Sequence, residues 1–322
     1  MNKSVKQVKL SIIILNYNSG HYLADCLQSI SRSKLKDNIE IIVADNASTD
    51  DSLLKIKKLK NYLKIRNLPV RQAGLKLKIV LNSQNLGFAA GNNRGLAHSH
   101  SKSPYVLFLN PDTLVSKNTL QKTINFLDKN PQASALTCKI ILKKTGQIQP
   151  ECHRGFPTPW RSLCYFSGLT RLFPHSKVFA GYFLGHLDKN KTHPIEACVG
   201  AFLAVRRNVG QTIGWWNEKY FFYGEDLDFC WQLHQKNYQL FYYPHTSIVH
   251  FQGISSGIKK TSQNLSGATR STKTKVAQAS TEAMRIFYQN NLLPNYPRFT
   301  QKLVLAGINL LEKIRVFKAK FL

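Results

Sequence analysis

The sequence predicts an α/β fold in which a mostly parallel sheet is flanked by helices. Three observations support this: apolar strand-like runs alternate with amphipathic helical segments, each run ends in polar residues, and the 322-residue chain is 43% hydrophobic. Strands that alternate with helices form parallel sheets joined by right-handed crossovers. In such sheets ligands bind beyond the carboxyl ends of the strands. We therefore expect a nucleotide-binding first half.

Four strands and the helices between them make up this half. The predicted strands are LSIIILN (10–16), IEIIVADN (39–46), LKIVLN (77–82) and YVLFLN (105–110). A helix over 20–33 carries Leu23, Leu27 and Ile30 on one face, and capping residues precede a second helix that starts at Ser52. The short apolar run near the N-terminus ends without a small-residue cleavage site, so we interpret it as the first strand and not as a signal peptide.

Polar side chains follow each of the four predicted strands. They are Asn16-Tyr17-Asn18, Asp45-Asn46, Asn82 and Asn110-Pro111-Asp112. One such strand end could be ordinary turn chemistry, with Asp112 capping the next helix. Four together indicate a ligand site, because amides and carboxylates can hydrogen-bond a base or a ribose or hold a metal.

The glycines of NLGFAAGNNRG lie four residues apart, at Gly87, Gly91 and Gly95. This spacing fits neither the G-x-G-x-x-G of a dinucleotide-binding loop nor a P-loop. We expect Gly91 and Gly95 to let a helix pack closely on the sheet, and Gly87 to shape the loop before it.

Composition narrows the classes of partner. The chain has 45 Lys and Arg against 17 Asp and Glu, a formal net charge of +28, which suits an anionic membrane surface, a phosphorylated substrate or nucleic acid. Nucleic acid is the weakest of these, because no zinc-finger spacing, basic zipper or RRM signature accompanies the charge. We expect no transmembrane helix, since no apolar run reaches about eighteen residues. Six cysteines without a Cys-x-x-Cys pair favour reduced thiols in a cytoplasmic protein.

Seven segments resemble, in order, the motifs of family 2 glycosyltransferases, most closely the rhamnosyltransferase-like branch. They are SIIILNYNSGHYLADCLQSI, IIVADNASTDDS, NLGFAAGNNRG, LFLNPDTLV, VGAFLAVRRNV, IGWWNEKYFFYGEDLDFCWQL and PHTSIVHFQGISS, within roughly residues 9–256. The resemblance implies a GT-A, Rossmann-like fold, a nucleotide-diphosphate sugar donor linked to dTDP or UDP, Mg²⁺ or Mn²⁺, and inversion at the anomeric carbon.

The same resemblance assigns roles to residues of this chain. Asp112 and His250 would hold the metal, with Asn110 in place of the first carboxylate of an Asp-x-Asp element. The donor would contact Asn16, Asp45, Asn46, Asn85, Gly87 and Asn110. Asp226 would be the general base with Glu225 in support, since a sugar hydroxyl must lose its proton; helix capping by these carboxylates is the alternative. Arg206, Arg207 and Asp228 are weaker candidates for contact with the acceptor or a phosphate, and a surface ion pair would also explain the two arginines.

Two places depart from the family pattern and bear on donor preference and acceptor orientation. Gln232 stands where relatives usually have Arg after Trp231. Gly214-Trp215-Trp216-Asn217 stands where they usually have Gly-Phe-Asp. The segment 151–196 is rich in aromatic residues, Pro and His without periodicity, and we expect it to form a variable insertion on the acceptor side.

We divide the chain into a transferase domain and two C-terminal parts. The domain spans 1–256, with a donor-nucleotide half at 1–130 and an acceptor and catalytic half at 131–256. A mobile basic loop is expected at 257–281 and a helical tail at 282–322. The tail places Leu303, Leu310, Ile314, Phe317 and Phe321 on one stripe among Lys and Arg, typical of a core helix or of an interfacial membrane helix.

The sequence therefore predicts an inverting glycosyltransferase of bacterial cell-surface polysaccharide synthesis. It would move a sugar such as rhamnose to a lipid-linked saccharide while peripheral at the inner face of the plasma membrane. The alternative is a basic binding protein for anionic lipid or nucleic acid on a degenerate transferase fold. The acidic residues Asp45, Asp112 and Asp226 are all retained, which argues against degeneracy.

Overall fold

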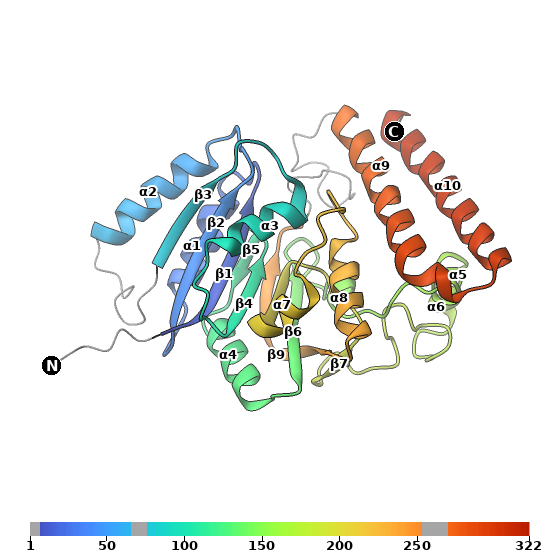
Figure 1. Ribbon diagram of the computed structural model, residues 1–322, viewed down its shortest axis with the longest axis horizontal. Helices are drawn as coiled ribbons and strands as arrows, with labels where there is room; N and C mark the ends of the chain where they lie inside the picture. The colour runs from blue at the N-terminus through green and yellow to red at the C-terminus, as the bar shows by residue number, and fades with distance from the viewer. Residues whose placement is uncertain (1–6, 66–75, 253–269, 322) are drawn as a thin grey trace.

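The structure is a computed structural model that describes residues 7–65, 76–252 and 270–321. Nine strands form one sheet with helices packed around it (Figure 1). The strands are β1 (Val8–Asn16), β2 (Asn38–Asp45), β3 (Lys76–Leu81), β4 (Tyr105–Leu109), β5 (Thr113–Val115), β6 (Ala133–Leu142), β7 (His193–Ile195), β8 (Phe202–Arg206) and β9 (Gln239–His250). The helices are α1 (Tyr22–Ser31), α2 (Ser52–Ile65), α3 (Gly87–Ala97), α4 (Thr119–Lys129), α5 (Pro159–Phe166), α6 (Leu169–Leu172), α7 (Arg207–Ile213), α8 (Glu225–Gln235), α9 (Arg270–Phe287) and α10 (Arg298–Phe321).

The first half of the sheet confirms the predicted parallel arrangement. Its order is β3-β2-β1-β4, and every neighbouring pair in it is parallel. Strand β4 is buried throughout and β1 almost throughout, as expected for strands covered on both faces. The parallel register places Asn16 opposite Asp45, so the polar strand ends meet at one edge.

The second half of the sheet contains both parallel and antiparallel pairs. Strand β8 is antiparallel to both β4 and β6, β6 is parallel to β9, and β5 and β7 are antiparallel to β9. The β9 sequence alternates buried with more exposed residues, which is typical of a strand with one covered face. A single sheet thus runs through both predicted halves; their assignment to donor and acceptor stays a prediction.

An aromatic cluster joins the two halves beneath the sheet edge. The ring of Phe108 in β4 lies 5.0 Å from that of Trp216 and 6.0 Å from that of Trp215. Trp216 lies in turn 4.7 Å from Phe229 of α8. The segment Gly214-Trp215-Trp216-Asn217, which departs from the family pattern, therefore packs α8 against β4 of the parallel half.

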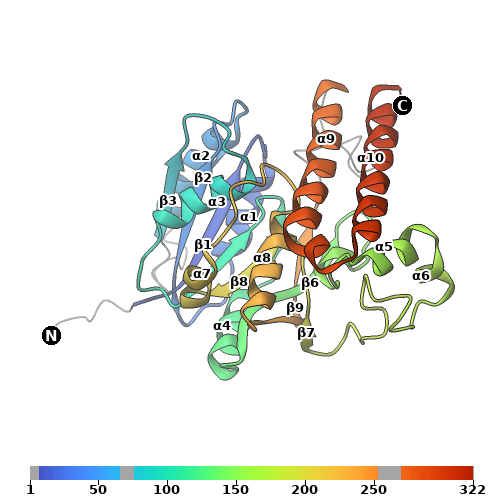
Figure 2. The ribbon, with the colours of Figure 1, turned by 45° about the vertical axis from the view of Figure 1, so that its right-hand side comes forward.

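The C-terminal part differs from the expected loop and tail. Residues 257–269 lie outside the described residues, and residues 270–281 are helical, because α9 begins at Arg270. The low apolar content of this segment was misleading, because Ala277 and Thr281 lie one helical turn apart and form a buried face of small side chains. Helix α10 packs against α9 as a pair (Figure 2). Of the predicted stripe on α10, the side chain of Phe321 lies outside the described residues. In the described ranges no helix combines the length and apolarity needed to cross a bilayer.

Gly95 provides a test of the close packing between α3 and the sheet. A Cβ there would lie 2.9 Å from Ile13 Cγ2 and 3.1 Å from Ala44 Cβ, so we expect Gly95→Ala to lower the free energy of unfolding by about 1–3 kcal/mol through overpacking. Gly307 in α10 is the matched control, because its added Cβ would meet no atom within 4 Å. Gly307→Ala should leave stability equal or raise it by up to about 1 kcal/mol. Urea denaturation of both variants measures this difference; equal effects would contradict it.

Candidate active site

Asn16 and Asp45 form the first polar group at the sheet edge. Asn16 Nδ2 donates to Asp45 Oδ1 at 2.7 Å, to Ser52 Oγ at 2.9 Å and to Ser48 Oγ at 3.0 Å. Asp45 Oδ2 accepts from the Ser48 amide at 3.0 Å. Both side chains are buried, and Asn16 Oδ1 has no hydrogen-bond partner among the described residues. The structure brings these predicted residues together, with one acceptor still unsatisfied.

A second network fixes the loop before α3. Asn46 Nδ2 donates to the Gly87 carbonyl at 2.9 Å and to Asn85 Oδ1 at 3.2 Å, and Asn46 Oδ1 accepts from Asn82 Nδ2 at 2.8 Å. Gly87 has φ +81°, and a Cβ there would lie 2.5 Å from the Phe221 carbonyl oxygen. That oxygen accepts from the Phe88 amide at 2.9 Å. The loop of the donor half is therefore hydrogen-bonded directly to the aromatic segment that precedes α8.

The end of β4 brings Asp112 next to His250. Strand β5 follows Asp112 at once, and its pairing with β9 places Thr113 opposite His250. His250 Nε2 lies 3.2 Å from Asp112 Oδ1, and both side chains are largely buried. Asn110, at the same strand end, accepts from Thr113 Oγ1 through its carbonyl at 2.8 Å. The two predicted metal ligands are thus adjacent.

The second nitrogen of His250 indicates which atom is available to a ligand. Nδ1 lies 2.7 Å from Gln149 Oε1, an oxygen that can only accept, so Nδ1 donates to it. Nε2 is then the ring nitrogen that faces the Asp112 carboxylate. Its contact with a carboxylate oxygen at 3.2 Å needs a proton or a cation between the two atoms.

The donor set fits a divalent cation that is shared with a phosphorylated ligand. Across the described ranges no group of three or more His, Cys, Asp and Glu side chains could hold a metal ion. A Mg²⁺-type ion commonly takes one or two carboxylates from the protein and its other ligands from substrate phosphates and water. The imidazole nitrogen of His250 favours a transition-metal ion such as Mn²⁺ over Mg²⁺.

The first turn of α8 presents Asp226 beside Arg154. Gly224 precedes the helix with φ +81°, a left-handed conformation that favours glycine. Arg154 Nη2 lies 2.9 Å from Asp226 Oδ2, and the Leu227 amide donates to Oδ1 at 2.8 Å. The Arg154 side chain is 8% exposed and that of Asp226 15%. The pair is therefore weakly screened, and Asp226 is held in one orientation.

Burial makes Glu225 a neutral acid next to this pair. Desolvation, and after it the charge of Asp226, raise the pKa of Glu225 to about 8, although its own backbone hydrogen bond and Arg154 act in the opposite direction. Glu225 Oε2 is buried, with no hydrogen-bond partner in the part of the chain that the structure describes. At neutral pH Glu225 is therefore mainly protonated.

Asp228 does not face a ligand, which corrects its assignment to the acceptor. Its carboxylate accepts from Asn291 Nδ2 at 2.9 Å, from the Tyr220 hydroxyl at 3.1 Å and from Asn217 Nδ2 at 3.3 Å. The side chain is buried among these donors. Asp228 thus anchors α8 to the turn between α9 and α10.

Arg206 and Arg207 also lie away from the site. Arg206 donates to three backbone carbonyls between the end of α4 and the start of β6, and Arg207 Nε donates to the Ser103 carbonyl at 2.7 Å. Arg206 pairs with Tyr105, at the start of β4, whereas Asp112 follows its end. The expectation of acceptor or phosphate contact is therefore corrected, because antiparallel β8 carries both arginines to the opposite sheet edge.

Sequence reasoning missed two residues, Gln149 and Arg154. They lie within one short segment, in which Gln149 orients His250 and Arg154 holds Asp226. The Gln149 amide is fixed to Ile140 of β6 at 2.8 Å, and the Arg154 backbone pairs with Ala197 in both directions. Neither residue stands in a periodic pattern. The available signal was a lone Arg in a mostly apolar stretch, since a buried cation needs a carboxylate.

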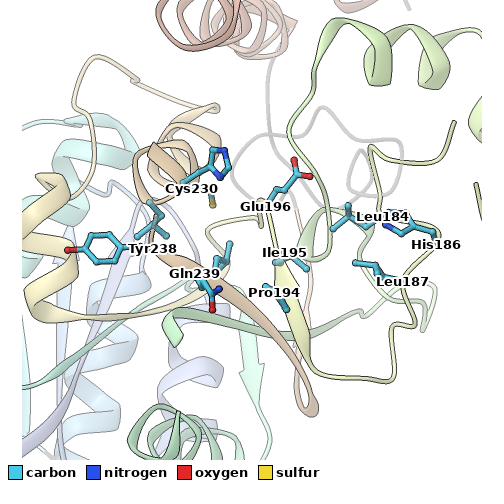
Figure 3. A pocket seen from close by; sticks show the side chains of 12 residues that line it. Leu184, His186, Leu187, Pro194, Ile195, Glu196, Cys230, Tyr238 and Gln239 are labelled. Atoms are coloured by element: carbon cyan, nitrogen blue, oxygen red, sulfur yellow. The ribbon is translucent and has the colours of Figure 1, made fainter. Parts of the chain in front are cut away.

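A separate cavity of about 330 Å³ lies between the 184–196 segment and the end of α8 (Figure 3). It contains none of the predicted site residues, and most of its lining is apolar. Its carboxylate, Glu196, already accepts from Arg161 Nη2 at 2.8 Å. The cavity is therefore separate from the polar strand ends and from the first turn of α8.

Comparisons with known proteins agree with this geometry. A family model described as glycosyl transferase family 2 matches residues 11–214. The chain is 24% identical over 257 residues to the N-acetylglucosaminyl-diphospho-decaprenol L-rhamnosyltransferase of Mycobacterium tuberculosis, covering 77% of this chain and 78% of that one. It is 25% identical over 253 residues to the rhamnosyltransferase WbbL of Escherichia coli K12, covering 74% and 82%.

Solved structures share the fold. The chain aligns with GalNAc-T7 at a TM-score of 0.58 and 15% identity, over 88% of this chain and 48% of that longer one. It aligns with the mannosyltransferase PcManGT of Pyrobaculum calidifontis at a TM-score of 0.56 and 16% identity, over 98% and 76%. The α/β architecture, the site at the carboxyl ends of the parallel strands and a family model that matches more than half of the chain lead to one conclusion. The protein belongs to glycosyl transferase family 2, has a GT-A-type fold, and is similar to the rhamnosyltransferase-like branch.

Proposed function

We propose that the protein is a metal-dependent, inverting glycosyltransferase that uses a nucleotide-diphosphate sugar. The observation that carries this proposal is the segment 149–154, which contacts His250 at one end and Asp226 at the other. The Cα atoms at the two ends of these six residues are five steps apart and so at most about 18 Å from each other. One site of the size of a substrate could therefore contain both the metal that binds the diphosphate and the base for the acceptor hydroxyl.

The donor would lie along the carboxyl ends of β1, β2 and β4. Asp45 and the unsatisfied Asn16 Oδ1 would border the nucleoside, with Asn46, Asn85, Gly87 and Asn110 on its other sides. Asp112 and His250 would hold Mn²⁺ or Mg²⁺, which when bound neutralises charge on the leaving diphosphate. The fold neighbours GalNAc-T7 and PcManGT, described with Mn²⁺ and with UDP or GDP-mannose, support this.

Asp226 would accept the proton of the acceptor hydroxyl as that oxygen attacks the anomeric carbon. Arg154 would position Asp226, and protonated Glu225 would keep a second negative charge away from it. Direct attack opposite the leaving group inverts the anomeric configuration. A double displacement would need a carboxylate nucleophile on the donor, and the retained motif supplies only the base.

The similar proteins suggest a class of substrate and a location in the cell. The name of the Mycobacterium tuberculosis relative specifies a diphospho-decaprenol acceptor and an L-rhamnosyl group. We therefore propose a dTDP- or UDP-linked donor, rhamnose among the candidate sugars, and a lipid-linked saccharide acceptor in cell-surface polysaccharide synthesis. Such an acceptor would require the protein to work at the inner face of the cytoplasmic membrane, where the net charge of +28 favours anionic lipid.

Removing the Asp112 carboxylate tests the metal site. Asp112→Ala should abolish the Mn²⁺-dependent part of the affinity for UDP or dTDP, because the remaining imidazole is one ligand alone. Isothermal calorimetry with and without Mn²⁺ measures this, and Asp188→Ala, which changes an exposed Asp, is the control. The same metal dependence in the Asp112 variant would identify Asp112 as a turn residue.

Asp226→Asn tests the base and the stereochemistry. The amide keeps the shape but cannot accept a proton, so turnover should fall at least ~10²-fold while donor affinity persists. NMR of the wild-type product should show the anomeric configuration opposite to that of the donor. Near-normal turnover by the variant would exclude Asp226 as the base, and a retained configuration would exclude direct displacement.

The raised pKa of Glu225 predicts a pH-dependent stability. Between its ordinary value of 4.5 and about 8 the folded state binds the proton more tightly than the unfolded state, so the free energy of unfolding should fall as pH rises through this window. Glu225→Gln should remove that part of the slope. Exposed Glu218→Gln should leave it unchanged. Urea denaturation over this pH range measures the slope of the free energy of unfolding against pH. An unchanged slope in Glu225→Gln would mean that the Glu225 carboxyl is ionised throughout the range.

A further inference from the structure

Large apolar side chains remain exposed on α10 although the helix packs on α9. Phe299 is 73% exposed, Leu303 57%, Leu310 60% and Ile314 43%, whereas Ile308 is only 4% exposed. The exposed residues are spaced by four, seven and four positions, so they form one stripe along the outer face of the helix. Burying them in water-free surroundings would be favourable by about 25 cal/mol per Å² of apolar surface.

Positive charge flanks this stripe on both sides. Lys302, Lys313 and Lys318 are exposed next to it. The helix has one acidic residue, Glu312, and that carboxylate is paired with Arg285 at 2.8 Å. The outer face of α10 is therefore a basic, amphipathic surface, the composition that lies in the interface of an anionic bilayer.

A second exposed apolar patch lies on α5 and α6. Trp160 is 48% exposed, Leu163 57%, Phe166 62% and Leu172 72%. The sequence from Arg154 to Leu187 contains no Asp or Glu, and Arg171 and Lys177 are exposed within it. Trp and other aromatic side chains with neighbouring basic residues are enriched at the level of lipid headgroups.

The two patches lie on neighbouring elements. Tyr288, in the turn before α10, donates to the Pro157 carbonyl at 2.5 Å and lies 2.7 Å from Ser162 Oγ of α5. Both views place α5 and α6 beside the beginning of α10, on the far side of the molecule from α2 and β3 (Figures 1 and 2). Helix α5 begins at Pro159, five residues after Arg154, the partner of Asp226.

We infer that the outer face of α10 together with α5 and α6 is a docking surface for an anionic lipid bilayer. The inference rests on the proposed function, and it specifies which face meets the membrane. A second copy of the chain is a poorer occupant, because the basic flanks would then face each other and repel. Docking through α5 would bring the base Asp226 toward a lipid-borne acceptor at the headgroup level.

Vesicle sedimentation of the full chain tests the surface. We compare phosphatidylcholine vesicles with mixed phosphatidylcholine–phosphatidylglycerol vesicles, and expect binding to the mixed vesicles that high salt releases. Leu303→Gln/Leu310→Gln and, separately, Phe166→Ser/Leu172→Gln should each weaken this binding by on the order of tenfold or more, since each removes two apolar anchors. Lys302→Gln/Lys313→Gln should weaken binding to the mixed vesicles and reduce its salt dependence.

Matched variants on the opposite face of the molecule test whether vesicle binding depends on this surface or only on the net positive charge of the chain. Leu54→Gln/Leu81→Gln changes two exposed leucines of α2 and β3, and Lys57→Gln/Lys58→Gln removes the same charge from α2. Both should bind vesicles like the wild type. Equal losses in these controls, or undiminished binding in the α10 and α5–α6 variants, would overturn the inference.

Two further measurements distinguish the remaining outcomes. Analytical ultracentrifugation without lipid should show a monomer; a dimer that Leu303→Gln/Leu310→Gln dissociates would identify the face as a contact between copies. Calorimetry with UDP or dTDP and Mn²⁺ reports on the proposed function alone. Nucleotide binding without sedimentation would refute the docking surface only, and sedimentation without nucleotide binding would refute the transferase proposal.

Discussion

Strand β8 is the constraint on which the geometry of the site depends. It lies between β4 and β6 and is antiparallel to both, so it joins the parallel half of the sheet to the half that carries β9. The Asn110 amide, directly after β4, donates to the Ala201 carbonyl just before β8 at 3.1 Å. His250 ends β9 and Asp112 follows β4. These residues lie 3.2 Å apart because β5, which begins directly after Asp112, pairs with the end of β9 within the same sheet.

The sequence carried enough information for the parallel half, but not for the direction of the strands after it. Alternating apolar runs and polar strand ends identified β1 to β4 and the position of Asp112, since burial on both faces leaves a clear pattern. The direction of β8 could not be predicted from the sequence, because a short apolar run has the same pattern in a parallel strand as in an antiparallel one. Arg206 and Arg207, predicted from the resemblance as weak candidates for acceptor or phosphate contact, instead donate to backbone carbonyls at the other end of β4.

Other differences have different physical causes. Arg154 and Gln149 act through single long-range contacts in an aperiodic segment, and a single contact leaves no trace in composition or periodicity. The start of α9 was missed because its buried face consists of Ala and Thr, whose small side chains pack closely without raising the apolar content. Glu225 and Asp226 were predicted through a motif resemblance. Their different environments, one buried and one paired with Arg154, became visible only in the fold.

The hydrogen bond from the Phe88 amide to the Phe221 carbonyl has a consequence for motion. It joins the loop before α3 to the segment before α8 at a point where Gly87 leaves no room for a side chain. A hinge between the two halves would have to break this bond, separate the Phe108–Trp216–Phe229 cluster and shear the sheet at β8. The two halves are thus joined by a hydrogen bond, an aromatic cluster and a shared sheet, and all three oppose a hinge between them.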